Sequence, residues 1–126
     1  MGHDRRLLTK EGQAMLERVR HICAELPEVE EIVDGFGHIT MKVRGKSSVL
    51  MGETEEGAGM SFKSDRETQH FLLQQNAGYV RTPYIGQHGW VSTKKGEPFD
   101  WEALSELLKE AYLRAAPKRL AKLVQP

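Results

Sequence analysis

The segment Tyr79–Val91, YVRTPYIGQHGWV, concentrates aromatic, basic and turn-forming residues and is the stretch around which we expect the chain to be organised. Pro83 disfavours a helical conformation at the preceding residue. Gly86 and Gly89 permit a positive φ or the close approach of another backbone. The segment therefore predicts an extended run, a turn over residues 85–89 and a strand that starts at residue 90. Its large aromatic side chains are either part of the core or part of a binding surface, and the sequence leaves both interpretations open.

The composition is that of an ordinary globular protein. The chain has 126 residues, of which 39% are hydrophobic and 29% charged, and these values predict one domain with a real core. We expect a flexible N-terminal segment over residues 1–9 and a single domain over residues 10–126. Lys plus Arg equals Asp plus Glu at 18 each, so a nucleic-acid ligand would require that positive charge is segregated on one surface.

The compartment is predicted from what the sequence contains. No apolar run approaches the roughly 20 residues that cross a bilayer, and the N-terminus lacks the apolar core of a signal peptide. Cys23 is the single cysteine, on the apolar face of a predicted helix, so we expect a buried structural thiol rather than a nucleophile. These features favour a cytoplasmic protein that does not bind membranes.

Hydrophobic periodicity predicts helices and strands in a particular order. Thr9 and Asp100 are expected N-caps, and Ser64 with Glu67 resembles a capping box with the serine as N-cap. The apolar contacts of that middle helix are expected from Phe71 and Leu72. The predicted helices cover residues 10–26, 65–76, 101–115 and 118–124, and the predicted strands cover residues 29–34, 38–43, 48–52, 59–63 and 90–93.

Strands that run together, rather than alternating with helices, indicate an α+β fold. We expect one antiparallel sheet of about five strands with helices packed on one face. In the strand over residues 38–43, Ile39, Met41 and Val43 should face the core. His38, Thr40 and Lys42 should then face outward, as should Ser61 and Lys63 of the fourth strand.

Sequence motifs that would identify a reaction are missing. There is neither a glycine-rich phosphate loop nor a GxSxG elbow nor an HExxH motif. The five histidines are not at metal-ligand spacing, so we expect no metal site and no cofactor. Catalytic residues are therefore not assigned, and a binding protein is favoured over an enzyme.

Basic residues occur at the expected turns of the sheet. Arg44, Lys46, Lys94 and Lys95 fall at hairpin or loop tips, where basic side chains would hold a nucleic-acid backbone. The alternative is that charged tips merely keep the turns soluble.

Three segments resemble the MmcQ/YjbR family of small bacterial proteins. They are the end of the first helix at 21–29, HICAELPEV; the strand 36–43, FGHITMKV; and the segment 83–91, PYIGQHGWV. The tail at 104–119 also fits, so the resemblance extends from about residue 13 to residue 123. Ile39 stands where the family often has proline, and Ala111 where a serine often precedes the tyrosine.

The resemblance implies a CyaY-like fold and a DNA-binding role through a double-wing arrangement. The leading hypothesis is a non-enzymatic module that binds DNA, with phosphate contacts from Arg44, Lys46, Lys63, Arg81, Lys94 and Lys95. The alternative is a small-ligand-binding or enzymatic pocket between the sheet and the segment 79–89, lined by His38, Tyr84, His88 and Trp90. A purely structural or protein-interaction domain is a third class.

Overall fold

The computed structural model describes residues 4–75 and 78–125. Four α-helices, one 3₁₀ helix (η1) and six strands make up the described chain. The elements in order are α1 (Lys10–Cys23), β1 (Val29–Val33), β2 (Ile39–Val43), β3 (Lys46–Thr54), β4 (Gly57–Phe62), α2 (Arg66–Gln74), β5 (Tyr79–Arg81), η1 (Ile85–His88), β6 (Val91–Thr93), α3 (Trp101–Ala115) and α4 (Lys118–Val124).

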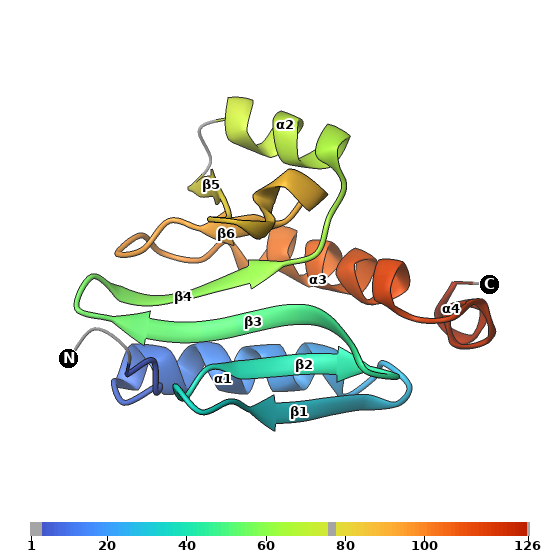
Figure 1. The fold of residues 1–126 in the computed structure, drawn as a ribbon, viewed down its shortest axis with the longest axis horizontal. Helices are drawn as coiled ribbons and strands as arrows, with labels where there is room; N and C mark the ends of the chain where they lie inside the picture. Colours follow the sequence, from blue (N-terminus) through green and yellow to red (C-terminus); the bar gives the residue numbers. More distant parts are fainter. Residues whose placement is uncertain (1–3, 76–77, 126) are drawn as a thin grey trace.

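The strands form one sheet in the order β1-β2-β3-β4-β6-β5, and every neighbouring pair is antiparallel. The predicted α+β class and antiparallel sheet are confirmed. The sixth strand, β5, lies in the run that the sequence predicted only as extended. Figure 1 views the sheet from the side that carries no helix, with α1 and α3 lying behind it and α2 beside the β5 edge.

The side chains alternate between the two faces of the sheet. Ile39, Met41 and Val43 of β2 are buried, as predicted, and so are Met60 and Phe62 of β4. They form one hydrophobic core with the apolar sides of α1 and α3. Because the strand period is two, burying these residues directs the intervening polar residues to the opposite, helix-free face.

Short polar side chains cap three of the helices. Thr9 accepts a hydrogen bond from the Gly12 N–H, and Asp100 accepts one from the Ala103 N–H, which confirms both predicted N-caps. The cap of α2 is Asp65, which accepts from the Thr68 N–H, rather than the expected Ser64. Two adjacent residues with capping ability cannot be ranked from sequence, because the backbone path decides which side chain reaches the free N–H groups.

The boundaries of two helices differ from the expectation. Helix α1 ends at Cys23 rather than at residue 26. Residues 76–77, where the sequence predicted the end of the second helix, lie outside the described part of the chain.

In α2, Phe71 is 58% exposed, whereas Gln69 is buried and its amide donates to the carbonyl oxygens of Gly86 and Trp90, both at 2.8 Å. A polar side chain therefore joins α2 to the β5–β6 segment.

The N-terminal segment, which the sequence predicted to be flexible, is bonded to the sheet over residues 4–9. The Arg5 N–H donates to the Phe36 carbonyl at 2.6 Å, and the Glu53 N–H donates to the Arg5 carbonyl at 3.2 Å. Leu7 is 5% exposed and belongs to the core. A buried leucine and two backbone hydrogen bonds hold the segment. The sequence does not indicate them, because so short a stretch shows no hydrophobic period.

Substitution of Gly89 tests how tightly the connection between α2 and β6 packs against the start of α2. Its φ is +93°, and an added Cβ would lie 2.7 Å from the Ser64 carbonyl oxygen. Gly89→Ala should therefore lower the free energy of unfolding by more than about 2 kcal/mol, from left-handed strain together with the clash. Gly45→Ala, with φ +82° and open space around it, should show the strain alone, and Gly35→Ala neither effect. Urea denaturation measures all three; equal losses at Gly45 and Gly89 would contradict the packing account.

Asp65 predicts a pH dependence of stability. Hydrogen bonds from the Thr68 N–H and from Arg114, whose Nη2 lies 2.6 Å from Oδ2, lower its pKa from 3.8 to about 2. A lowered folded-state pKa stabilises the protein above pH 3.8, and this stabilisation is lost as the pH falls through 2. Asp65→Asn keeps the cap and loses the ion pair, so it should cost less than about 1 kcal/mol at pH 7 because the pair is half-exposed. In urea denaturation the cost should vanish near pH 2; a cost that does not change with pH would refute this role.

Candidate functional site

The helix-free face of the sheet carries a continuous row of residues that crosses all six strands. The register pairs them one to the next, so they lie side by side on one face. In spatial order the row is Ile32, Thr40, Leu50, Ser61, Ser92 and Val80. Three of the four central residues, Thr40, Ser61 and Ser92, bear hydroxyl groups, and the fourth is Leu50. The strands that carry the row lie side by side in Figure 1.

Three hydroxyl groups at the β4, β6 and β5 end of this row form a chain. Ser61 Oγ lies 2.7 Å from Ser92 Oγ, and Ser92 Oγ lies 2.8 Å from Thr82 Oγ1. Each hydroxyl is both a donor and an acceptor, so the chain can turn its hydrogens to suit a ligand on the face. Ser61 and Ser92 line the same groove, described below.

Two glycines form the floor beside the row. Gly52 of β3 and Gly59 of β4 are directly paired in register. A Cβ on Gly52 would lie 2.9 Å from Cδ2 of His38, and a Cβ on Gly59 would lie 3.5 Å from Cγ of Lys95. The missing side chains thus let the imidazole and the lysine methylenes lie down against the sheet.

His38 is held by the turn between β1 and β2. Its Nδ1 lies 2.9 Å from Asp34 Oδ2, while Asp34 Oδ1 accepts from the N–H groups of Phe36 and His38. Burial raises the pKa of the Asp34 carboxyl, but these hydrogen bonds outweigh burial and hold its pKa below the usual value. The carboxylate fixes the ring through Nδ1 and leaves Nε2 for another partner.

Lys95 closes the same side of the groove. Its Nζ donates to Thr54 Oγ1 at 3.1 Å. Burial lowers the pKa of this lysine, nearby Glu56 opposes that shift, and the positive charge of Arg5 adds to it. Two cations that repel each other at one edge of the groove make a site where an anion would be stabilised.

Together these side chains line a groove of about 340 Å³. Its charged lining residues are Arg5, Asp34 and Lys95, and His38 lies with them. The alternation of the strands places Lys42 and Lys63 on the same face, on the other side of the central row from His38 and Gly59. Arg5 and Lys95 outnumber the one carboxylate of the lining, Asp34, and Lys42 lies opposite Glu30 in the register. The groove therefore carries a small excess of positive charge, which favours anions.

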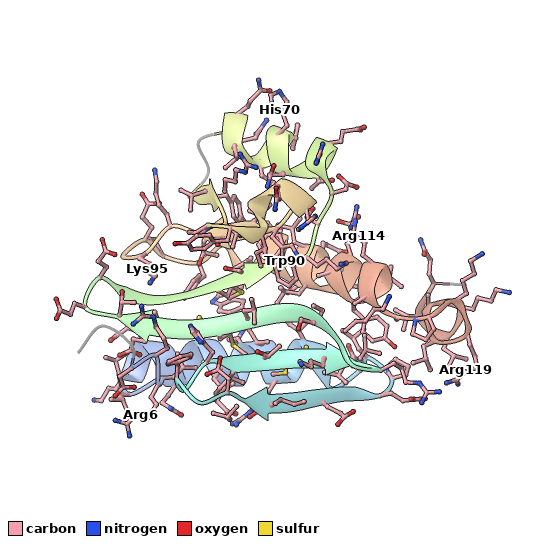
Figure 2. All side chains as sticks on the ribbon, in the orientation of Figure 1. Arg6, His70, Trp90, Lys95, Arg114 and Arg119 are labelled. Atoms are coloured by element: carbon pink, nitrogen blue, oxygen red, sulfur yellow. The ribbon has the colours of Figure 1, made fainter. Side chains whose placement is uncertain are left out.

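The six basic residues predicted to contact phosphates do not form one surface. Lys63 and Lys95 flank the groove, and Lys94 is the neighbour of Lys95 in the chain. Arg44 pairs with Glu28, which also pairs with Arg119, and Figure 2 shows Arg119 and Lys95 at opposite ends of the molecule. The basic residues predicted at turns or on the edge strand outside the groove are Arg44, Lys46, Lys94 and Arg81.

The predicted double wing has unlike tips. The β2–β3 tip carries Arg44, whose charge is matched by Glu28 at 3.3 Å. The other predicted tip is the turn after β6, which carries Lys94 and Lys95, and Lys95 lines the groove. The two basic turns therefore differ, because an ion pair offsets one charge at the β2–β3 turn and Lys95 lies against the sheet face.

The four residues predicted to line a pocket are also separated. His38 lines the groove, whereas Tyr84, His88 and Trp90 do not. Trp90 is 7% exposed and is not available to stack on bases, while Tyr84 is 94% exposed on a strained backbone with φ 65°. The expected cleft against the segment 79–89 is replaced by the groove on the helix-free face. Arg5 and Ser92 are site residues that the sequence did not indicate, because backbone bonds to Phe36 and Glu53 bring Arg5 there and strand pairing brings Ser92.

Two further observations concern metal ligands and long apolar helices. Within residues 4–75 and 78–125, no group of three or more His, Cys, Asp or Glu side chains is placed to hold a metal ion. No helix in these residues is long and apolar enough to cross a membrane.

Cys23 is predicted to be chemically inert in the folded state. The thiol is 8% exposed, and burial, with a smaller effect of Glu31, raises its pKa to about 11. Modification by Ellman's reagent at pH 8 should therefore be at least about tenfold slower than in urea-unfolded protein, because the thiolate is the reactive form. Equal rates in native and unfolded protein would show that the thiol is accessible.

The fold and the family are established by comparison with known proteins. An antiparallel sheet with helices on one face defines a small α+β protein, and the YjbR family model matches residues 24–114. The chain therefore belongs to the YjbR family, as its resemblance indicated. The crystal structure of Deinococcus radiodurans protein DR2400, with family-model domain DUF419, has a TM-score of 0.68 and 26% identity and covers 86% of each chain. No curated protein matches the chain.

Proposed function

We propose that this YjbR-family protein is a non-enzymatic binding protein whose helix-free sheet face takes a phosphate-bearing ligand. The first candidate is the phosphodiester backbone of DNA. The observation that carries the proposal is the arrangement of the groove, where the hydroxyl groups of Ser61 and Ser92 lie beside Arg5 and Lys95. Hydroxyl groups and basic side chains are the usual partners of phosphate oxygens.

Segregation of charge supports this proposal despite the net charge of zero. The groove face carries four basic residues, Arg5, Lys42, Lys63 and Lys95, and two carboxylates, Asp34 and Glu30. The opposite side of the sheet has a cavity lined by five glutamates, described below. A neutral protein with an excess of basic residues on one face can attract phosphates there.

Lys63 and Lys95 remain the proposed phosphate contacts from the sequence. Both flank the groove, whereas Arg44 and Lys46 stand at a turn where Glu28 already neutralises one charge. The pair Lys63 and Lys95 and the pair Arg44 and Lys46 thus carry equal charge at separate places. Variants of the two pairs can be compared directly.

DNA binding should depend on the groove rather than on the hairpin tip. Fluorescence anisotropy with duplex and single-stranded probes should show affinity that falls log-linearly with salt, with a slope of about −0.9 per phosphate contact on duplex. Lys63→Ala/Lys95→Ala should weaken binding about tenfold at low salt and reduce the slope by about 2. Arg44→Ala/Lys46→Ala removes the same charge and should change affinity less than about twofold.

The opposite pattern, with the tip pair essential and the groove pair dispensable, would refute the groove as the DNA site. No binding at low salt would remove DNA as the ligand.

A small phosphorylated metabolite is the second candidate. The groove volume of about 340 Å³ lies at the lower end of the range of small-molecule sites, about 300–1,000 Å³. If DNA does not bind, AMP and pyrophosphate are the probes to titrate by calorimetry. Binding that is lost in Lys63→Ala/Lys95→Ala would support this candidate, and the absence of binding by both probes would refute a phosphate site on this face.

A further inference from the structure

The largest cavity described in the protein lies on the helix side of the sheet and has a volume of about 810 Å³. Its walls come from α1, the β3–β4 hairpin, the segment 96–99 that leads into α3, and the first residue of α3. Sites for small organic molecules span about 300–1,000 Å³, so the cavity has the size of such a site. Thr54 lines this cavity and also accepts a hydrogen bond from Lys95, which lines the groove. The other lining residues of the cavity differ from those of the groove.

The cavity has a mostly apolar lining with an aromatic pair. Met15 and Ala58 contribute aliphatic surface, and Phe99 and Trp101 lie with ring centroids 5.2 Å apart. Both rings are only partly buried, so their free faces are available to a ligand. Such a lining favours a ligand with an apolar or aromatic body.

The charge around the cavity is strongly negative. Its charged residues are one arginine, Arg18, and five glutamates, Glu11, Glu17, Glu53, Glu55 and Glu97. Glu17 pairs with Arg20, and Glu53 accepts a hydrogen bond from the Thr9 hydroxyl. Within residues 4–75 and 78–125, the other three glutamates form no ion pair, so their charges are available to a ligand.

A cation already occupies one aromatic face of the cavity. The guanidinium carbon of Arg18 lies 5.0 Å from the centroid of the Trp101 ring. This geometry is that of a cation–π contact, in which the ring attracts positive charge. The aromatic wall and the glutamates therefore favour the same sign of charge in a ligand.

We propose that this cavity binds a small organic cation with an aromatic or apolar body, of the aryl-alkylamine class. The body would pack against Phe99 and Trp101, and the ammonium group would face Glu55 and Glu97. An anion of the same shape would be repelled by these carboxylates, and a neutral analogue would gain only the apolar contacts. This site is separate from the proposed phosphate site and has the opposite preference for charge.

A matched set of three probes tests the preference. They are 4-phenylbutylamine, 4-phenylbutanol and 4-phenylbutyrate, which share one apolar body and carry a positive, a neutral and a negative end. In calorimetric titrations of the wild-type protein at pH 7, the amine should bind at least about fivefold more tightly than the alcohol and the carboxylate, because only its ammonium is attracted by the glutamates. Added salt should reduce the advantage of the amine without affecting the alcohol.

Two variants locate the site. Glu55→Gln/Glu97→Gln should bring the amine to within about twofold of the alcohol while the affinity for the alcohol stays unchanged. Glu106→Gln/Glu110→Gln removes two carboxylates from α3 outside the cavity lining and should keep the preference. Trp101→Leu should weaken the amine and the alcohol by similar factors, because both pack the same phenyl group against this ring.

Three outcomes would overturn the proposal. They are the absence of amine binding at millimolar concentration, a carboxylate that binds as tightly as the amine, and an unchanged preference in Glu55→Gln/Glu97→Gln. Because neither Lys63 nor Lys95 lines this cavity, a failure here leaves the phosphate proposal standing, and the reverse also holds.

Discussion

Burial of one face of the antiparallel sheet is the constraint on which the rest of the structure depends. The inward side chains of β2, β3 and β4 pack against α1 and α3, and Met41, Met51 and Phe62 are each at most 2% exposed. A register slip of a single residue would move this apolar set into solvent and the polar set into the core. The position of the hydroxyl row, and with it the groove, therefore follows from the energetics of the core.

The two candidate sites occur at the same end of the sheet and on opposite faces. The β3–β4 hairpin and the segment after β6 supply residues to both. Thr54 lines the glutamate-rich cavity, while its hydroxyl accepts a hydrogen bond from Lys95, which lines the groove. The protein is neutral overall, yet basic residues are in excess in the lining of the groove and glutamates in the lining of the cavity. Net charge alone is therefore a poor guide to the ligands of this protein.

Patterns over a few residues correctly predicted the features of the fold that depend on neighbours in the chain. The alternation of β2 predicted which side chains are buried, and the caps Thr9 and Asp100 were found because each bonds three residues ahead in the chain. At α2 the same reasoning was right for Leu72, which packs against the core, and wrong for Phe71, because Gln69 is the buried residue of this helix. The partners of Gln69 are backbone carbonyl groups 17 and 21 residues away, and no local periodicity reports them.

The sequence by itself determined the fold class, the family and the inventory of charged and hydroxyl residues. Only the tertiary structure decided which of these residues share a surface, because strand pairing and the contacts of the turns and the N-terminal segment bring Arg5, His38, Ser92 and Lys95 together from four distant points of the chain. It also decided that Trp90 is buried and that Arg44 is paired with Glu28. Side-chain type and spacing depend on local chemistry, whereas a binding site depends on register and topology, which the long-range burial of the core selects.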